Sequence, residues 1–350
     1  TVRFSDCTFI NNRSISGGTV FFTQLQSIHP VDFNGCLFEK NSNYVIHYNP
    51  NNQAINEGAF KFKSCVFKEN GLPVVTTSVA KGKATIEQCI FSSNESVNGA
   101  TGGTVIGLGG ASNLGNILFA NTLFFNNIAR EISATTAQII NCIIIDEANP
   151  GFASKGIFTG NTCSISNSLF RVPSCDSIGT NWPNTATILC DSSNLFNTEP
   201  LFVNPSASDF HLQSCSPAIN AGANAILNSL GITTDIEGNP RIRNTVVDMG
   251  PYEKHISLHP SVSAQPTCAG TSDGAIKISP ALCPPFSLTW DNGDTTGTNI
   301  SGLAAGTYVF TATGANNIPI TDTLLIDEPL PVEVMLVAHD VQCPGTANGW

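Results

Sequence analysis

The residues best suited to chemistry are cysteines that recur along the first half of the chain. They begin the stretches CTFINN at Cys7, CLFEKN at Cys36, CVFKEN at Cys65 and CIFSSN at Cys89, and TLFFNN at Thr122 keeps the pattern with its first residue changed. Thiolates could bind a metal ion or form disulfides. Metal sites favour pairs such as C-x-x-C with a nearby histidine, and the sequence contains no such pair. We therefore expect no metal site at these cysteines.

A second candidate is the pattern G-x-S-x-G at Gly270 to Gly274, which occurs at the nucleophile of many hydrolases. That motif needs a strand, a turn and a helix, and no helical pattern follows. A later copy of the same sequence reads GTANG, with Ala347 at the position of Ser272. A turn explains both copies, and a nucleophile explains one. Since the six histidines also lack ligand spacing such as H-E-x-x-H, the sequence predicts no catalytic residue and no cofactor.

The charged candidates are Glu39, Lys40, Lys68 and Glu69, which place opposite charges at equivalent positions of neighbouring motifs. Enzymes built on parallel β-helices group Asp, Arg or Lys from several coils on one exposed strand surface. Four alternating charges on a solvated surface are far more often ordinary cross-strand ion pairs. We interpret them as such.

The repeat itself predicts the elements that carry these residues. With the first residue of each motif as position zero, the copies lie 20 to 33 residues apart, at Cys7, Cys36, Cys65, Cys89, Thr122, Cys142, Ser168 and Asn194. Apolar residues recur at positions minus five, minus three and plus two. The change from odd to even positions indicates two short strands that meet at a corner. This pattern is typical of a coil in a parallel β-solenoid, whose coils stack ~4.8 Å apart.

Stacked coils give the repeated residues structural roles. The phenylalanines at plus two should form an internal aromatic stack of Phe9, Phe38, Phe67, Phe91 and Phe124. The cysteines at zero should form a column of buried free thiols, namely Cys7, Cys36, Cys65 and Cys89, because in-register Cβ atoms ~4.8 Å apart exceed the usual disulfide distance. The asparagines at plus five should turn the chain in left-handed backbone and bond to the next coil; they are Asn12, Asn41, Asn70, Asn94 and Asn127. Outside the column, one bridge among Cys175, Cys190 and Cys215 is expected if the protein is secreted.

Composition excludes several classes of function. The net charge of -11 leaves no Lys/Arg excess for nucleic acid and disfavours docking on an anionic membrane. No apolar run approaches the ~20 residues of a membrane-spanning helix. Since the chain begins within one repeat and ends within another, we expect it to be a fragment whose secretion signal lies elsewhere.

Beyond residue 255 the pattern changes to short strands separated by turns. The stretches TCAGTSDGAIKIS, PPFSLTWDNGD, ISGLAAGTYVFTAT and ITDTLLIDEP fit an Ig-like sandwich of about 70 residues. GLAAGTY predicts a tyrosine corner, in which Tyr308 bonds back to the preceding backbone. QCPGTANG, at Gln342 to Gly349, aligns with TCAGTSDG, at Thr267 to Gly274, and begins a second copy.

These motifs resemble known families. C-x-F-x-x-N with SGGT, EGAF and TGGT is similar to the repeats of polymorphic outer-membrane proteins and related right-handed parallel β-helix proteins of the pectin-lyase-like type, over residues 1 to about 200. Residues 194–223 and 233–253 resemble the ending of secreted bacterial β-helix proteins with choice-of-anchor domains. We expect that segment to cap the last open edge of the solenoid. The later module resembles the SprB repeat of adhesins from gliding bacteria. Such repeats often pair a cysteine after a late Asn-Gly turn; here Cys283 comes early, and a Cys268–Cys283 bridge is expected.

The sequence therefore predicts an all-β chain with a right-handed parallel β-helix and C-terminal cap at 1–255, a linker at 256–261, an Ig-like SprB-type repeat at 262–329 and the start of a second repeat at 330–350. The resemblance implies a non-enzymatic adhesin, exported by type IX secretion to the bacterial outer surface and binding surfaces or glycans. The alternatives are a β-helix polysaccharide lyase or glycoside hydrolase with accessory modules, or a structural spacer. A cluster of Asp, Arg or Lys in a groove favours the enzyme, and a face of Asn, Ser and Thr favours binding.

Overall fold

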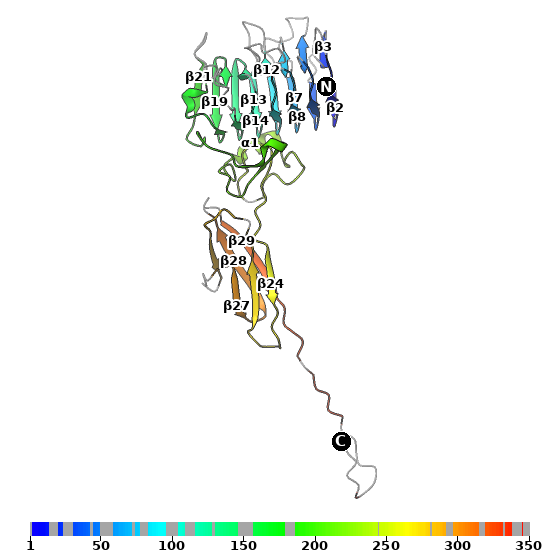
Figure 1. Ribbon diagram of the computed structural model, residues 1–350, viewed down its shortest axis with the longest axis vertical. Coiled ribbons are helices and arrows are strands. Elements are labelled where there is room, and N and C mark those ends of the chain that lie inside the picture. The colour runs from blue at the N-terminus through cyan, green and yellow to red at the C-terminus, as the bar shows by residue number, and fades with distance from the viewer. Residues whose placement is uncertain are drawn as a thin grey trace. The chain divides into compact units, whose positions relative to one another are not determined.

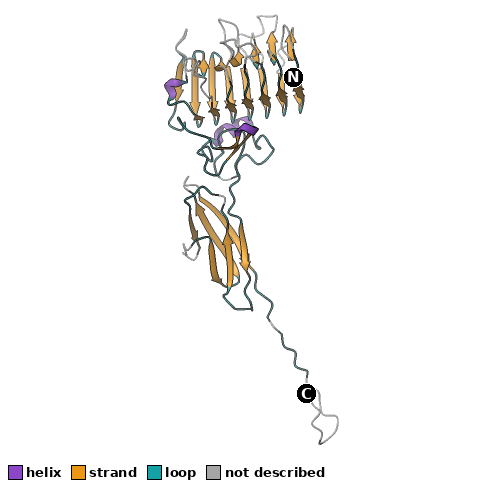
Figure 2. Cartoon of the chain, in the orientation of Figure 1, coloured by secondary structure: helices purple, strands orange, loops and turns teal. Residues whose placement is uncertain are grey.

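The computed structural model of the protein describes residues 2–13, 20–23, 31–42, 45–49, 59–71, 74–77, 83–95, 104–108, 116–127, 130–145, 157–178, 186–243, 245–280, 282–291, 297–314, 319–331, 333–337 and 345. The chain separates into two compact units, residues 1–255 and 256–350. The boundary falls where the sequence pattern changes. Nearly all regular structure is strand, as the colours of Figure 2 show, so the chain is all-β.

The first unit is a parallel β-helix built from three parallel sheets (Figure 1). The eight-stranded sheet contains β1 (Val2–Ser5), β4 (Val31–Asn34), β7 (Ala59–Lys63), β10 (Lys83–Glu87), β13 (Asn116–Ala120), β16 (Thr136–Ile140), β19 (Thr162–Ser166) and β21 (Thr187–Cys190). The seven-stranded sheet contains β2 (Thr8–Ile10), β5 (Leu37–Glu39), β8 (Val66–Lys68), β11 (Ile90–Ser92), β14 (Leu123–Phe125), β17 (Ile143–Ile145) and β20 (Leu169–Phe170). The six-stranded sheet contains β3 (Val20–Thr23), β6 (Ile46–Asn49), β9 (Val75–Thr77), β12 (Thr104–Leu108), β15 (Arg130–Ser133) and β18 (Phe158–Thr159).

Coils 1 to 6 thus contribute one strand to each sheet, whereas the repeat predicted two strands per coil. The third strand lies at a variable distance from the motif: β3 begins 13 residues after Cys7, and β9 begins 10 residues after Cys65. A strand without a fixed position in the repeat leaves no register to detect in one sequence. The coils are numbered here from coil 1, which contains β1, β2 and β3, to coil 8, which contains β21.

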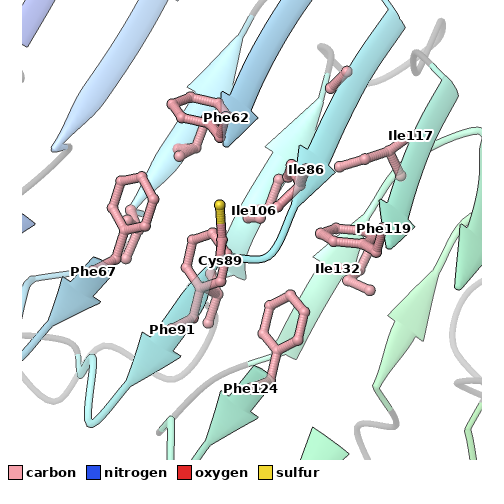
Figure 3. Packing of buried hydrophobic residues seen from close by; sticks show 14 of the residues in the cluster. Phe62, Phe67, Ile86, Cys89, Phe91, Ile106, Ile117, Phe119, Phe124 and Ile132 are labelled. Carbon is pink, nitrogen blue, oxygen red and sulfur yellow. The ribbon is translucent and has the colours of Figure 1, made fainter. Parts of the chain in front are cut away.

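The repeated phenylalanines stack on one another inside the solenoid, as the register predicts. Phe9, Phe38, Phe67, Phe91 and Phe124 are Cα partners in successive strands. Their ring centroids lie 4.8, 4.7, 4.6 and 5.0 Å apart, and the rings are within 10° of parallel. A second column, at minus three, meets the first edge to face; Phe62 and Phe67 are 5.6 Å apart. Figure 3 shows these rings around Cys89, so the core is one continuous apolar interior.

The cysteines at position zero are buried free thiols. Cys36, Cys65, Cys89 and Cys142 are at most 1% exposed, while Cys7, in the first coil, is half-buried. The thiols donate weakly to backbone carbonyls two residues earlier; Cys65 Sγ lies 3.3 Å from Lys63 O. Burial raises the pKa of Cys142 to about 12, so this thiol stays protonated and poorly reactive.

The asparagines at plus five form a ladder, but they do not adopt the left-handed backbone that the sequence suggested. That conformation belongs to position plus four, with φ between 51° and 55° at Asn11, Lys40, Glu69, Ser93 and Asn126. The ladder amides point inward: Asn41 Nδ2 donates to Asn70 Oδ1 at 2.9 Å and to Phe9 O at 2.8 Å. Equivalent bonds join Asn12 to Asn41, Asn70 to Asn94 and Asn94 to Asn127. These buried side chains therefore satisfy one another from coil to coil.

A second left-handed corner lies at position minus one, where φ is between 45° and 63°. Its residues are Asp6, Gly35, Ser64, Gln88, Asn121, Asn141 and Asn167. Asparagine tolerates this conformation better than other residues with a Cβ. Gly35 adopts the same conformation at φ 63°, and a Cβ there would meet only the exposed side chain of Asp6 on the neighbouring coil, which can move.

Residues 200–253, which we call the strap, pack along the side of the solenoid. The strap contains β22 (Phe202–Asn204), η2 (Pro205–Ala207), β23 (Asp209–Leu212) and α1 (Asn224–Leu230). It bonds to the corner residues of coils 4 to 7. Asn121 Nδ2 donates to Asp248 O at 3.3 Å, Asn141 Nδ2 to Ala223 O at 3.1 Å and Asn167 Nδ2 to Ala221 O at 3.1 Å. Figure 1 shows α1 and its loops below the strands.

The strap explains a row of apolar residues on the outer side of the seven-stranded sheet. At plus one, Ile90, Leu123, Ile143 and Leu169 are at most 3% exposed. Gly250 lies so close that a Cβ there would be 2.8 Å from Ile143 Cδ1. We expected this segment to cover the last open edge of the solenoid. That position is wrong for residues 200–253, because the strap covers one side of four coils.

Shorter elements complete the last coils. Phe196 stacks on Phe170 at 5.5 Å, so the start of the predicted cap does lie on coil 7. A disulfide joins Cys175, in η1 (Cys175–Ser177), to Cys190 in β21. One bridge in this region was expected.

The second unit contains two three-stranded antiparallel sheets. One pairs β24 (Pro260–Ala264), β25 (Gly274–Ile278) and β27 (Asn299–Leu303), and the other pairs β26 (Ser287–Trp290), β28 (Gly306–Thr313) and β29 (Pro319–Ile326). Alternate residues are buried, and Trp290 packs on Phe310 with 5.0 Å between ring centroids. Tyr308 Oη donates to Ala304 O at 2.8 Å, which is the back-bond that the tyrosine-corner pattern predicts.

Two expectations about this unit need correction. The predicted linker, residues 256–261, is partly structured: β24 begins at Pro260, and Ser279 N donates to Leu258 O at 3.1 Å. The expected Cys268–Cys283 bridge is not formed, because Cys268 carries a free, exposed thiol. Most of the predicted second copy at 342–349 lies outside the described residues.

Candidate functional site

The outer face of the eight-stranded sheet presents polar side chains on successive coils. Residues at minus five and minus three point into the core, so those at minus six, minus four and minus two point outward. On coils 5 to 8 these positions hold short polar groups: Asn116, Thr136, Gln138, Thr162, Ser164, Ser166 and Thr187. Thr136 Oγ1 donates to Asn116 Oδ1 at 2.7 Å. Four apolar residues, Leu118, Ala120, Ile140 and Leu189, interrupt the row.

The same face is charged on coils 1 to 4. Its outward positions hold Arg3, Asp32, Lys61, Lys63, Lys83 and Glu87. A hollow of about 380 Å³ lies among them and is lined by Arg3, Asp32, Asn34, Lys61 and Lys63. This end of the face could therefore contact a charged ligand, and the other end could bond to hydroxyl groups.

Two ion pairs organise the charged end. Arg3 Nε lies 3.4 Å from Asp32 Oδ2, and the Arg3 side chain is 75% exposed, so this pair contributes little. Lys61 Nζ lies 2.7 Å from Glu87 Oε1, and the Glu87 side chain is fully buried. The adjacent Gln88 donates its Nε2 to Thr234 O, so the strap closes this corner of the face. Removing Lys61 would leave a buried carboxylate without its partner, which is costly.

The charged candidates chosen from the sequence lie at positions plus three and plus four of the repeat and do not belong to this cluster. Glu39, Lys40, Lys68 and Glu69 form a string of exposed pairs, with Lys40 Nζ 3.0 Å from Glu39 Oε1 and 3.6 Å from Glu69 Oε2. The hydrogen bond from Lys40 lowers the pKa of Glu39. These four residues behave as the ordinary ion pairs that we expected. The signal for the cluster was present in the alignment of repeats, at minus four and minus two.

The loop with the G-x-S-x-G pattern is organised by an aspartate. Asp273 accepts hydrogen bonds from Thr267 N at 2.9 Å, Thr267 Oγ1 at 2.6 Å and Thr271 Oγ1 at 2.8 Å. These bonds lower the pKa of Asp273 to about 2. The loop leads into β25 and no helix follows it, so the setting of a nucleophile elbow is not met here.

A cluster of titratable groups lies on the strap. His211 Nδ1 is 2.6 Å from Asp209 Oδ1, and His211 Nε2 is 3.1 Å from Glu237 Oε2. The His211 ring also packs on Tyr252, with 4.2 Å between centroids. Glu237 lies 26 residues from His211 in the sequence, so no local motif joins the two residues. The cluster ties β23 to the turn at Asp235–Asn239.

Over the described ranges, no group of three or more His, Cys, Asp and Glu residues is placed to hold a metal ion. None of the helices seen in those ranges has the length and apolarity required to cross a membrane. Comparison of the chain with protein-family models, curated proteins and solved structures found no match. The geometry of the outer face is therefore the basis for a functional proposal.

Proposed function

We propose that this chain is a non-enzymatic protein of the adhesin type, secreted or displayed on a bacterial cell surface, that binds a polysaccharide along the outer face of its eight-stranded sheet. The observation that carries the proposal is the run of outward Thr, Ser, Asn and Gln side chains on coils 5 to 8. Hydroxyl and amide groups donate and accept hydrogen bonds, which suits a polymer of sugars. Successive coils repeat these groups at ~4.8 Å, so a long ligand can make many weak contacts.

The second unit fits this proposal as an Ig-like module of the SprB type. Its antiparallel sheets and the Tyr308 corner support that assignment. Modules of this kind would extend the solenoid from the cell, and type IX secretion is the route that the resemblance implies.

A panel of plant, algal and bacterial polysaccharides tests the proposal. We expect at least one polymer to retain the protein without new reducing ends and without ultraviolet absorbance from unsaturated products. The double variant Thr136→Val/Thr162→Val keeps the side-chain shape and removes two hydroxyls, so it should weaken retention. Thr321→Val, in the second unit, is the matched control. Retention by no polymer would favour a structural spacer instead.

The second candidate is a polysaccharide lyase or glycoside hydrolase. One observation favours it: a buried carboxylate, Glu87, is paired with Lys61 beside the hollow that contains Arg3, Asp32 and Lys63. Carboxylates and lysines serve as general acids and bases when their environment shifts their protonation. Cleavage of any polymer, abolished by Glu87→Gln, would establish the enzyme and overturn the adhesin proposal.

A further inference from the structure

The charge of the outer face on coils 1 to 4 is opposite to that of the chain. The chain carries a net charge of -11. The outward positions of β1, β4, β7 and β10 hold four cations, Arg3, Lys61, Lys63 and Lys83, and two carboxylates, Asp32 and Glu87, so the surplus is 4 − 2 = +2. A positive surface on an acidic protein concentrates anionic partners locally.

Two of these lysines have no carboxylate partner among the described residues. Arg3 pairs with Asp32 and Lys61 pairs with Glu87, and no carboxylate among the described residues lies within ion-pair distance of Lys63 or Lys83. The other lysines of the same coils differ: Lys40 and Lys68 are both bound by Glu69. The outer face of the eight-stranded sheet therefore carries unpaired positive charge, whereas Lys40 and Lys68 on the neighbouring sheet are paired.

The three lysines form a line across two strands. Lys61 and Lys63 are two residues apart on β7, which places their side chains on the same side about 7 Å apart. Lys83 begins β10 and pairs with Ala59, two residues before Lys61, so it continues the line on the next strand. Lys83 is exposed and Lys61 and Lys63 are partly exposed; the Lys61 side chain is 41% exposed. A line of separated cations fits a linear polymer that carries one negative charge per repeat.

We propose that this cationic row, defined as Arg3, Lys61, Lys63 and Lys83, binds a polyanionic polysaccharide, either carboxylated or sulfated. The inference rests on the proposed function and narrows its ligand. Anionic groups would pair with Lys63 and Lys83, and sugar hydroxyls would contact the Thr and Ser side chains of coils 5 to 8. A neutral polymer would leave the two lysines unpaired and gain nothing from the row.

Dextran, carboxymethyl-dextran and dextran sulfate provide the sharpest test, because they share one backbone and differ in charge. The full chain should be retained by one or both anionic forms and pass through neutral dextran. Raising the salt from about 50 to about 500 mM should weaken retention, since it shortens the screening length of the exposed lysines. Which anionic form binds more tightly distinguishes a carboxylated from a sulfated ligand.

Variants locate the site. Replacing one lysine should raise the polymer concentration needed for half-maximal retention roughly two- to fivefold. The triple variant Lys61→Gln/Lys63→Gln/Lys83→Gln should raise it roughly tenfold or more. The control Lys40→Gln/Lys68→Gln/Lys277→Gln removes the same charge elsewhere and should bind like the unmodified protein. Because Lys61 supports buried Glu87, Lys63→Gln/Lys83→Gln keeps the test valid if the triple variant unfolds.

The outcomes separate the two proposals. An equal loss of retention in the variants of the cationic row and in the control variant would overturn the assignment of the site to the cationic row. If only neutral polymers of the wider panel retain the protein, the proposed polysaccharide binding stands and the proposal of an anionic ligand is wrong. If no polymer retains the protein, the proposed function fails as well. Duplex DNA held as tightly as the anionic dextrans would show a general polyanion site and overturn the assignment to a polysaccharide.

Discussion

The coils and the strap belong to one compact unit but are held by different interactions. In the coils most buried polar groups are neutral, and those of the ladder bond to the same group one coil away, as Asn41 does to Asn70, although Glu87 is buried and charged. In the strap most buried polar groups are charged, and each makes its own set of contacts. Arg241 is 1% exposed, its Nη2 donates to Asp248 O at 3.0 Å and to Gly250 O, and its Nη1 lies 3.7 Å from Glu253 Oε2.

The difference predicts that the free energy of unfolding depends on many similar bonds in the coils and on a few buried charges in the strap. A ladder repeats a modest interaction many times, so the loss of one member leaves the others in place. A buried charge cannot be replaced by a neighbour, and burial raises the pKa of Asp248 and Glu253, which shows how poorly that site accepts an unpaired carboxylate. Single changes in the strap should therefore cost more than equivalent changes in the coils.

Arg241→Met should have the largest effect. It removes both carbonyl contacts and leaves Glu253 buried without its cation, which costs about 3 to 5 kcal/mol. Denaturant unfolding measures this free energy, and limited proteolysis should show cleavage within residues 200–253 before the coils are cut.

Arg243→Met is the matched control, because Arg243 is exposed and bonds only weakly, to Asn239 Oδ1 at 3.3 Å. It should change stability by less than about 0.5 kcal/mol. If the two arginine variants unfold at the same denaturant concentration, the buried charge does not hold the strap and the comparison fails.

Loss of the disulfide in the last coils should have the second largest effect on the free energy of unfolding. Cys175 and Cys190 close a loop with a sequence separation of 15. Replacing both by serine should lower the free energy of unfolding by about 3 kcal/mol, chiefly through the greater freedom of the unfolded chain. Calorimetry of the oxidised protein and the double variant measures the change. An unaltered melting temperature would mean that coils 7 and 8 need no cross-link.

The ladder should give a smaller and graded response. Asn70→Ala removes the donor to Asn94 Oδ1 and Phe38 O and leaves the Asn41 amide with one of its two acceptors, which should cost about 1 to 3 kcal/mol. Asn12→Ala, in the exposed first coil, should cost less because water can replace the lost bond. Equal costs at the two positions would mean that burial does not strengthen the bonds of the ladder.

The coils could be predicted from sequence because each repeat restates the same constraint. The column from Phe9 to Phe124, the free thiols of Cys36 and Cys65 and the inward amides of Asn41 and Asn70 all follow from register. The predicted left-handed corner, at plus five, lies one residue after the observed corner at plus four. Both plus four and plus five hold polar residues, and asparagine at plus five had a stronger local preference for that backbone than Lys40 or Glu69.

The strap and the charged face could not be predicted with the same ease. The contacts of Asn141 with Ala223 and of Arg241 with Glu253 occur once, so no repeat reveals them. One sign was available: the apolar residues at plus one, from Ile90 to Leu169, lie on the outer side of strands whose inner side is already apolar. Strands that are apolar on both faces must be covered on both.

The smallest predicted effect is a dependence of the strap on pH through His211. Burial opposes protonation of the ring, but hydrogen bonds to Asp209 and Glu237 and their negative charges outweigh it and raise the pKa of His211. The unfolded chain protonates near 6.5, so the stabilisation is complete below about pH 6.5 and is lost as pH rises through the folded pKa. The same hydrogen bond lowers the pKa of Asp209, whose contribution is lost only in acid. Since His211 is 42% exposed, the effect should stay below about 1 kcal/mol.

Denaturation of the protein at pH 6 and pH 8 should show this loss of stability. His211→Gln should abolish the loss, and the variant of exposed His255, His255→Gln, should keep it. A loss that persists in His211→Gln would place the pH dependence in the buried charges around Arg241 instead.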